Sequence, residues 1–179
     1  MTKPQIVYLV GMPGCGKSYW SRQLANSLHA SATDLDEYIS QAKGQSISDI
    51  FAQDGEQHFR YLESQYLRQI SELAPHGALH IVATGGGTPC FHQNMHYMLK
   101  QGLVIYLEAP TDWLLHNLKL SDIVRPLIAN KVPQEQLPAL NALLASRKDF
   151  YEQAQVKVAA MRAELATFVE IFKQYKILF

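Results

Sequence analysis

Residues 11–18 read Gly-Met-Pro-Gly-Cys-Gly-Lys-Ser and match the phosphate-loop pattern GxxxxGK[ST] at every fixed position. An apolar run precedes them and a helical pattern follows, which is the setting that this loop requires. Glycines let backbone N–H groups turn toward a phosphate, and the start of a helix adds the positive end of its dipole. The Lys17 ammonium can then reach the β- and γ-phosphates, and the Ser18 hydroxyl can bind Mg²⁺. The pattern predicts a nucleoside triphosphate site made of Gly14, Cys15, Gly16, Lys17, Ser18 and Tyr19.

Two classes of nucleotide-binding protein fit poorly. A GTPase needs the base-reading pattern NKxD, but the nearest match, residues 130–133, places Pro133 where the aspartate should be. The chain of 179 residues is also short for a motor or transport ATPase. We interpret Cys15 inside the loop as a small filler side chain rather than a redox-sensitive thiol.

Two short motifs could handle a phosphoryl acceptor. Asp34 and Asp36 follow the second expected strand, so one carboxylate can support the Mg²⁺ shell while the other faces an acceptor hydroxyl. The alternative is a solvated helix start, where acidic residues are favoured anyway. Arg60 and Glu63 are three residues apart and share a helix face, so the carboxylate can aim the guanidinium at a ligand. An ordinary surface ion pair remains the alternative for these two.

A triple glycine and two further arginines complete the candidate set. Residues 85–87 directly follow an expected strand and would let the backbone approach a ligand closely, unless they form only a flexible turn. Arg125 lies in Ser121–Pro138, which carries three prolines and is predicted to be a mobile loop, so it could stabilise transferring charge. Arg147 on the next helix could join Arg60 in clamping a carboxylate.

These residues need elements that bring them together. Apolar runs alternate with helical patterns, which predicts a three-layer α/β/α fold with a sheet of five parallel strands. A substrate would then bind at the carboxyl ends of the strands. The expected strands are Ile6–Val10, Ala30–Thr33, Ala78–Ala83, Leu103–Leu107 and Val156–Ala160. The expected helices are Lys17–His29, a short one after Ser46 through Phe51, Glu56–Leu73, Phe91–Gln101, Asp112–Leu118, Pro138–Gln155 and Ala163–Tyr175.

Composition narrows the class of protein. A length of 179 residues predicts a single domain over 1–179. Sixteen basic residues balance sixteen acidic ones, which argues against nucleic-acid binding. No apolar run approaches the ~20 residues of a membrane span, and two cysteines make no disulfide scaffold. We therefore expect a soluble, cytoplasmic protein that binds neither membrane nor nucleic acid.

The motifs occur together in the order and approximate spacing of one family. The phosphate loop, DLD, FRYLE, GGG, RPLI and the later Arg147 make the chain resemble shikimate kinase from about Ile6 to Gln155. This resemblance implies a nucleoside monophosphate kinase-like fold with strand order 2-3-1-4-5. It also implies transfer of the γ-phosphoryl group of ATP to the 3-hydroxyl of shikimate, with Mg²⁺ as cofactor, in aromatic amino acid and chorismate biosynthesis.

The resemblance also implies residue roles. The catalytic residues would be Lys17, Asp36 and the lid residue Arg125, which also contacts the nucleotide, and Ser18 and Asp34 would serve the metal. The acceptor region would be about 34–63, the lid about 119–136, and the protein a monomer. Shikimate would contact Asp36, Phe51, Phe59, Arg60, Gly85, Gly86, Gly87 and Arg147.

The sequence departs from the family at the adenine side. Leu118, with Lys119 beside it, stands where family members often carry an arginine against the adenine. Two other interpretations stay open: a kinase for another small metabolite, such as a gluconate-kinase-like enzyme, and a non-catalytic paralogue that binds ATP. The first leaves the arginine clamp without an obvious carboxylate, and the second has no need of Lys17, Ser18, Asp36 and Arg125 together.

Overall fold

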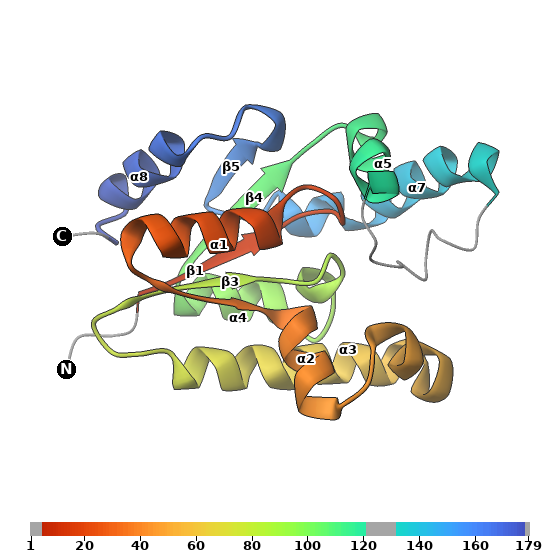
Figure 1. Cartoon of the computed structure of the whole chain (residues 1–179), viewed down its shortest axis with the longest axis horizontal. Helices are drawn as coiled ribbons and strands as arrows, with labels where there is room; N and C mark the ends of the chain where they lie inside the picture. Colours follow the sequence, from red (N-terminus) through yellow and green to blue (C-terminus); the bar gives the residue numbers. More distant parts are fainter. Residues whose placement is uncertain (1–4, 121–131, 178–179) are drawn as a thin grey trace.

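The computed structural model describes residues 5–120 and 132–177. Its sheet has five parallel strands in the order β2-β3-β1-β4-β5, as predicted (Figure 1). The three inner strands are buried along almost their whole length, because helices cover both faces of the sheet. The strands are β1 (Gln5–Val10), β2 (Ser31–Asp34), β3 (Leu79–Ala83), β4 (Leu103–Glu108) and β5 (Val156–Ala159).

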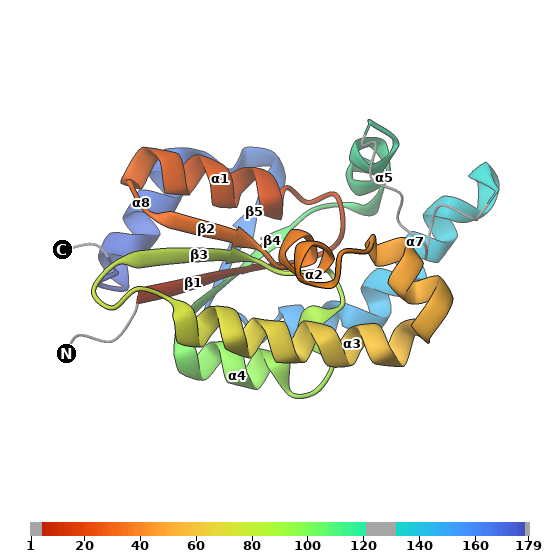
Figure 2. The ribbon, with the colours of Figure 1, turned by 60° about the horizontal axis from the view of Figure 1, so that its bottom comes forward.

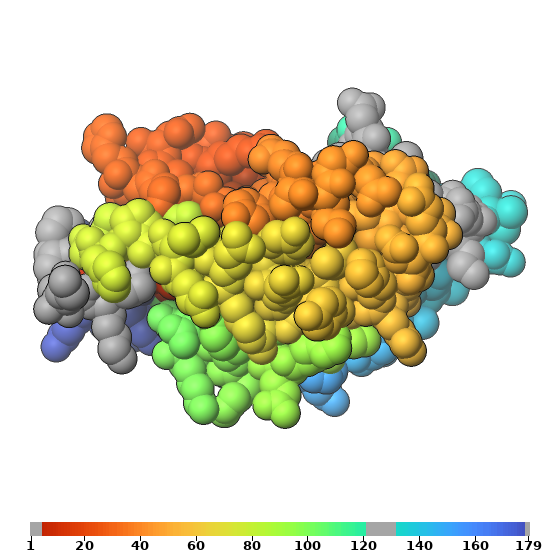
Figure 3. Space-filling view, turned by 90° about the horizontal axis from the view of Figure 1, so that it is seen from below, coloured from red at the N-terminus to blue at the C-terminus, as the bar shows by residue number. Residues whose placement is uncertain are grey.

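Helices form the two outer layers that the alternating pattern predicts. Helices α1 (Lys17–Leu28) and α8 (Leu165–Gln174) lie on one face of the sheet, and α3 (Ile47–Leu73) and α4 (Asn94–Gln101) lie on the other (Figures 1 and 2). Figure 3 shows α3 running along the underside with α4 beside it. No helix within the described ranges is long and apolar enough to cross a membrane.

The remaining elements gather at the carboxyl ends of the strands. Parallel pairing brings all five carboxyl ends to one edge of the sheet, where the phosphate loop also lies (Figure 2). This is where α/β sheets bind their ligands. The elements at or near this edge are α2 (Leu35–Lys43), the 3₁₀ turns η1 (Thr88–Cys90) and η2 (Ala160–Arg162), α5 (Thr111–Leu120) and α7 (Pro133–Tyr151).

Two expectations about helices were wrong. Helix α2 was not among the expected helices, although the helix start left open as the alternative at Asp34 and Asp36 is correct: the Asp34 carboxylate caps α2 by accepting N–H bonds from Asp36 (3.0 Å) and Glu37 (3.3 Å). The predicted loop Ser121–Pro138 is wrong at its end, because α7 already begins at Pro133. Proline fits a first helical turn, where its missing N–H has no intrahelical acceptor. Residues 121–131 of that loop lie outside the described residues.

Helix α3 is two helices joined at a glycine, as the separate patterns predict. Gly55 has φ 82° and ψ 171° and interrupts the helical backbone. Ser46 caps the first part: its Oγ accepts the N–H of Asp49 at 3.1 Å and donates to the Asp49 carboxylate at 2.6 Å. The bend at Gly55 allows Phe51 of the first part to pack against Phe59 of the second, with ring centroids 4.7 Å apart.

Candidate active site

The phosphate loop holds a buried ammonium group with neutral oxygens. Lys17, 8% exposed, donates from Nζ to the carbonyl oxygens of Gly11 (2.9 Å) and Met12 (3.0 Å). Within the described residues no carboxylate forms a salt bridge with it. Gly16, at φ 94°, starts α1 directly before Lys17. The ammonium and the helix start together make an electropositive cradle that suits a phosphate.

Ser18 and Asp34 link this loop to the next strand. The Ser18 hydroxyl donates to one oxygen of the Asp34 carboxylate, whose other oxygen caps α2. The pair therefore presents hydroxyl and carboxylate oxygens beside the loop. In residues 5–120 and 132–177 no group of three or more His, Cys, Asp or Glu side chains could hold a metal. The pair still suits Mg²⁺, which typically takes one or two protein ligands and completes its shell with phosphate and water oxygens.

The segment Gly85–Gly87, hereafter the glycine loop, is the point where the acceptor-side residues meet. A Cβ on Gly85 would lie 2.5 Å from Glu63 Oε1 and 2.9 Å from Asp36 Oδ1. A Cβ on Gly87 would lie 2.5 Å from Arg60 Nη1. These contacts are too short for any side chain, so lack of space requires glycine here. The glycine loop is therefore packed closely against side chains of the site and is not merely a flexible turn, while its approach to a ligand stays a prediction.

Gly86 joins the two halves of the site. A Cβ on it would lie 2.7 Å from Pro13 Cδ of the phosphate loop and 3.1 Å from Arg147 Nη1. The loop expected to bind a nucleotide and the arginine expected to bind a carboxylate thus meet at one residue. An acceptor held by Arg147 would lie next to a phosphate held by the loop.

Arg60 is buried and bound by two carboxylates. It is 4% exposed, and its Nη1 donates to Glu63 at 2.7 Å while Nη2 (2.8 Å) and Nε (3.1 Å) donate to Glu56. Burial alone would lower the pKa of Arg60, but Glu63 and Glu56 together raise it above its ordinary value. The expectation of an ordinary surface pair is wrong. Three of the five N–H groups of Arg60 are used by protein, which leaves donors for a ligand.

Aromatic rings surround the Arg60 guanidinium. Its Cζ lies 5.7 Å from the ring centroid of Phe51, 5.4 Å from that of Phe59 and 4.8 Å from that of Phe91. Such contacts favour a cation over the ring faces and hold the planar group in one orientation. Phe51, Phe59 and Phe91 therefore form an apolar wall around Arg60, while the contact of Phe51 and Phe59 with a substrate stays a prediction.

Glu63 is the most deeply buried charged group of the site. The pKa of Glu63 is raised to about 7, because burial raises it more than the Arg60 charge lowers it; the Asp36 charge also raises it, and hydrogen bonds from Thr88 and Arg60 lower it. The Thr88 hydroxyl donates to Glu63 at 2.5 Å, and Asn94 Nδ2 donates to the Thr88 carbonyl at 3.0 Å. This chain of bonds locks Glu63 under the glycine loop.

Arg147 differs from Arg60 in its partners. It is 5% exposed, and no carboxylate in the described residues lies within salt-bridge distance of it. It projects from α7 toward Gly86 and interacts with Tyr151 one helical turn later. A buried guanidinium without a negative partner is costly by itself and favours an anionic ligand.

The structure brings together most of the predicted site residues. Around one edge of the sheet lie the phosphate loop, Asp34, Asp36, Arg60, the glycine loop and Arg147.

Cys15 is fully buried, and its Sγ would lie 2.9 Å from a Cβ on Gly11, which supports its interpretation as a filler. Tyr19 is 58% exposed and packs edge-on against Trp20 rather than in the loop. Arg125 and most of the predicted lid, 119–136, lie outside the described residues.

Sequence reasoning missed several residues of the site. Glu56 precedes Arg60 by four positions, a helical ion-pair spacing that could have revealed it. Tyr151 follows Arg147 by four and shares its buried helix face, but this signal says nothing about a partner far away in sequence. The missed residues that touch site groups are Glu56, Thr88, Phe91 and Tyr151.

Leu118 and its neighbour Asn117, on the side of the phosphate loop where the adenine is expected, both contact Gly14. A Cβ on Gly14 would lie 3.1 Å from Leu118 Cγ, and Asn117 Nδ2 donates to the Gly14 carbonyl at 3.0 Å. Leu118, the residue that departs from the family pattern, therefore packs on the phosphate loop. It provides contact area at this place but no charge.

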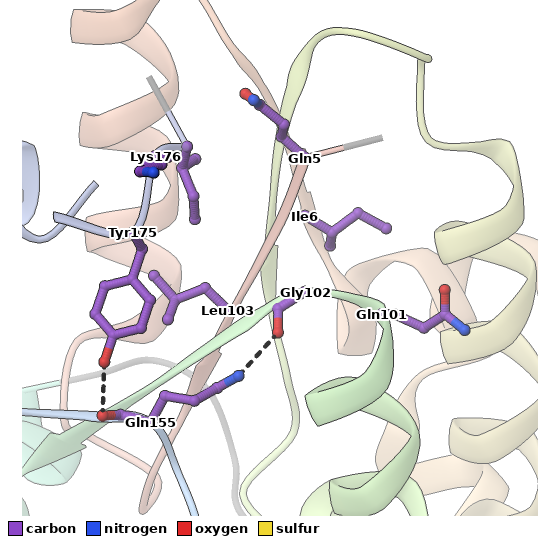
Figure 4. A pocket seen from close by; sticks show the side chains of 9 residues that line it. Gln5, Ile6, Gln101, Gly102, Leu103, Gln155, Tyr175 and Lys176 are labelled. Atoms are coloured by element: carbon purple, nitrogen blue, oxygen red, sulfur yellow. Dashed lines mark hydrogen bonds between the residues drawn. The ribbon is translucent and has the colours of Figure 1, made fainter. Parts of the chain in front are cut away.

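A cavity of about 300 Å³ lies at the opposite end of the sheet. Figure 4 shows Gln155 bridging this region: its Nε2 donates to the Gly102 carbonyl at 3.2 Å, and its backbone carbonyl accepts from the Tyr175 hydroxyl at 3.2 Å. The lining is neutral apart from Lys176, and it lies at the amino ends of β1 and β4. The cavity is therefore remote from the phosphate loop.

Comparison with known proteins agrees with this geometry. The family model described as shikimate kinase matches residues 13–176. A shikimate kinase of Parasynechococcus marenigrum is 41% identical over 152 residues, 85% of this chain and 75% of that protein. The structure of shikimate kinase from Acinetobacter baumannii in complex with shikimate is 30% identical, with a TM-score of 0.85 over 99% of this chain and 97% of that one.

A gluconokinase from Sinorhizobium meliloti is more distant, with 12% identity and a TM-score of 0.52 over 95% of this chain and 90% of that one, a likeness of fold alone. The family model and the relatives that cover most of the chain agree with the site built above, and the chain belongs to the shikimate kinase family.

Proposed function

We propose that this shikimate kinase family member transfers the γ-phosphoryl group of ATP to the 3-hydroxyl of shikimate, releasing ADP and shikimate 3-phosphate. One observation carries the proposal: Gly86 lies between Pro13 of the phosphate loop and Arg147. A small acid held by the arginines would therefore sit beside the phosphates. Phosphoryl transfer depends chiefly on such positioning and on neutralising charge.

The acceptor side fits the chemistry of shikimate. Its carboxylate would bind the remaining donors of Arg60 and the uncompensated charge of Arg147. The ring would lie on the wall formed by Phe51 and Phe59, and hydroxyl groups would meet the backbone of the glycine loop. Asp36 would accept the hydrogen bond of the attacking hydroxyl, which orients the oxygen and provides an acceptor for its proton.

The donor side fits ATP. Lys17, now bound to two carbonyl oxygens, would contact the β- and γ-phosphates, and residues 14–19 would supply backbone N–H groups. Ser18 would hold Mg²⁺ directly and Asp34 would support it through water. When bound, the ion neutralises phosphate charge and orients the γ-phosphate. Arg125 on the predicted lid, the monomeric state and the cytoplasmic location stay predictions.

The test is a coupled assay of ADP release with ATP, Mg²⁺ and separate acceptors: shikimate, quinate, gluconate and nucleoside monophosphates. We expect turnover with shikimate alone. Asp36→Asn should lower kcat by about 10²-fold or more, the order seen when one group that stabilises a transition state is removed. Asp112→Asn, an exposed aspartate on α5, is the matched control and should leave kcat unchanged.

Two other outcomes of this assay would favour the alternative functions. Turnover with gluconate but not shikimate would favour the gluconate-kinase-like alternative. ATP binding measured by calorimetry, without turnover of any acceptor, would favour the non-catalytic alternative.

A further inference from the structure

Tyr151 is a fully buried tyrosine that the nucleotide and acceptor assignments leave unused. Its hydroxyl donates to the backbone carbonyl of Gly86 at 2.6 Å and lies 3.6 Å from Met12 Sδ in the phosphate loop. Its ring stacks on Tyr106 of β4, with centroids 5.1 Å apart and planes 29° apart. One side chain thus touches the glycine loop, the phosphate loop and the central sheet.

Packing alone does not require the hydroxyl group. A phenylalanine would fill nearly the same space and keep the stack on Tyr106. Burial raises the pKa of Tyr151, with Arg147 acting in the opposite direction, so the hydroxyl stays protonated and able to donate. The bond to Gly86 is therefore the specific property of a tyrosine here.

That bond fixes the peptide that joins Gly86 to Gly87, the last two residues of the glycine loop. The described peptide bonds are trans, so the Gly86 carbonyl and the Gly87 N–H lie in one plane and point in opposite directions. Glycine peptides have unusually wide conformational freedom. Within the described residues, neither the Gly86 nor the Gly87 N–H donates to a protein acceptor.

Tyr151 and Arg147 lie on the same buried face of α7, four residues apart. The hydroxyl bond therefore also ties the helix that carries Arg147 to the glycine loop. The backbone donors and the guanidinium, which come from distant parts of the chain, are held in one fixed arrangement.

We propose that Tyr151 is a positioning residue for the acceptor, whose hydroxyl holds the glycine loop so that its backbone N–H groups meet a substrate hydroxyl while Arg147 meets the carboxylate. The inference rests on the proposed function. It assigns Tyr151 to orientation of the substrate rather than to the transfer step itself.

The first test compares Tyr151→Phe with Tyr106→Phe. Both changes remove one oxygen from a buried, stacked ring, but only the first leaves the Gly86 carbonyl without its donor. We expect Tyr151→Phe to raise KM for shikimate about tenfold, the size expected for a buried acceptor left unpaired, with kcat and KM for ATP within about twofold. Tyr106→Phe should leave all three constants near the wild-type values.

The second test asks whether Tyr151 acts through a substrate hydroxyl. Calorimetry would measure Kd of shikimate and of its 4-deoxy and 5-deoxy analogues for both proteins. The loss caused by Tyr151→Phe should be about tenfold for shikimate and should shrink to about twofold for the analogue that lacks the contacted hydroxyl. This readout holds even where the variant is less stable, because it compares ligands on one protein.

Three results would overturn the inference: an unchanged KM for shikimate in Tyr151→Phe, an equal effect of Tyr106→Phe, or an equal loss for shikimate and both analogues. Failure of the wild-type protein to phosphorylate shikimate would instead overturn the proposed function. The two failures are therefore distinguishable in the same set of assays.

Discussion

Arg60 and Arg147 approach the glycine loop from two different helices, and their charges are balanced differently. Both are almost completely buried. Arg60 forms salt bridges with Glu63 and Glu56, at 2.7 and 2.8 Å. Arg147 forms none with any carboxylate in residues 5–120 and 132–177. Carboxylates balance the charge of the Arg60 guanidinium, whereas none among the described residues balances that of Arg147.

The difference indicates a division of labour between the two arginines. Arg60 is held rigidly by ions and rings, so it contributes geometry to the site with little net charge. Arg147 contributes the net charge that draws a carboxylate into the site. Removing each should therefore have different consequences for stability, even though both should weaken binding of the acceptor.

The largest expected effect is on stability. Arg60→Met leaves Glu63 buried without its cation and should lower the free energy of unfolding by about 3–5 kcal/mol. Arg147→Met removes a buried charge that no carboxylate of the described residues pairs with, so the free energy of unfolding should be unchanged or higher. Both variants should raise KM for shikimate by about 30-fold or more. Urea unfolding followed by tryptophan fluorescence gives the comparison, and equal destabilisation by both variants would contradict it.

A second effect depends on pH. The pKa of Glu63 is raised to about 7 in the folded chain against an ordinary value of 4.5. Between these values the folded chain holds a proton that the unfolded chain has lost. The free energy of unfolding should therefore fall as pH rises through this window, by on the order of 3 kcal/mol in total.

Glu63→Gln should remove this contribution, so the difference between the two proteins should change with pH only between about 4.5 and 7. Glu72→Gln, an exposed change on the same helix, is the control and should keep the wild-type slope. Identical slopes in Glu63→Gln and wild type would show that Glu63 keeps an ordinary pKa.

The smallest expected effect concerns Glu56. Its side chain is 46% exposed and binds the same guanidinium that the substrate carboxylate would bind. Glu56→Gln leaves a hydrogen-bond acceptor but removes one of the two negative charges that lie beside Arg60. KM for shikimate should therefore fall about twofold, the size expected for a partly exposed ion pair. Steady-state kinetics at low salt is the measurement, with Glu37→Gln as control. A rise in KM would show instead that Glu56 is needed to orient Arg60.

Local signals predicted much of the fold. Apolar runs identified β1, β3 and β4, whereas β2 and β5, of four residues each, were expected mostly from their context in the alternation of strands and helices. The capping pattern of Ser46 and the separate helical patterns on either side of Gly55 predicted the two parts of α3. Helix α2 was expected only as the alternative to a ligand role for Asp34 and Asp36, and its extent was not predicted, although the Asp34 carboxylate caps it. The start of α7 was misplaced because prolines were taken as breakers, although Pro133 lies in a first turn that tolerates it.

Sequence spacing predicted some residues of the site but neither their burial nor their long-range contacts. Spacing identified the Arg60–Glu63 pair because the two residues are one helical turn apart. It could not tell a surface pair from a buried one, because burial depends on Thr88 and the glycine loop packing over Glu63. The contact between Tyr151 and Gly86 gave no sequence signal, since 65 residues separate them.

The sequence by itself determined the phosphate loop, the alternation of strands and helices, and the set of residues that resembles one family. These features are local or follow the order of motifs along the chain. Only the tertiary structure decided that carboxylates balance the charge of Arg60 but, in the part of the chain that is described, not that of Arg147, and that the three glycines leave no room for a side chain. Charge balance and close packing depend on groups that meet only when distant segments are folded against the same edge of the sheet.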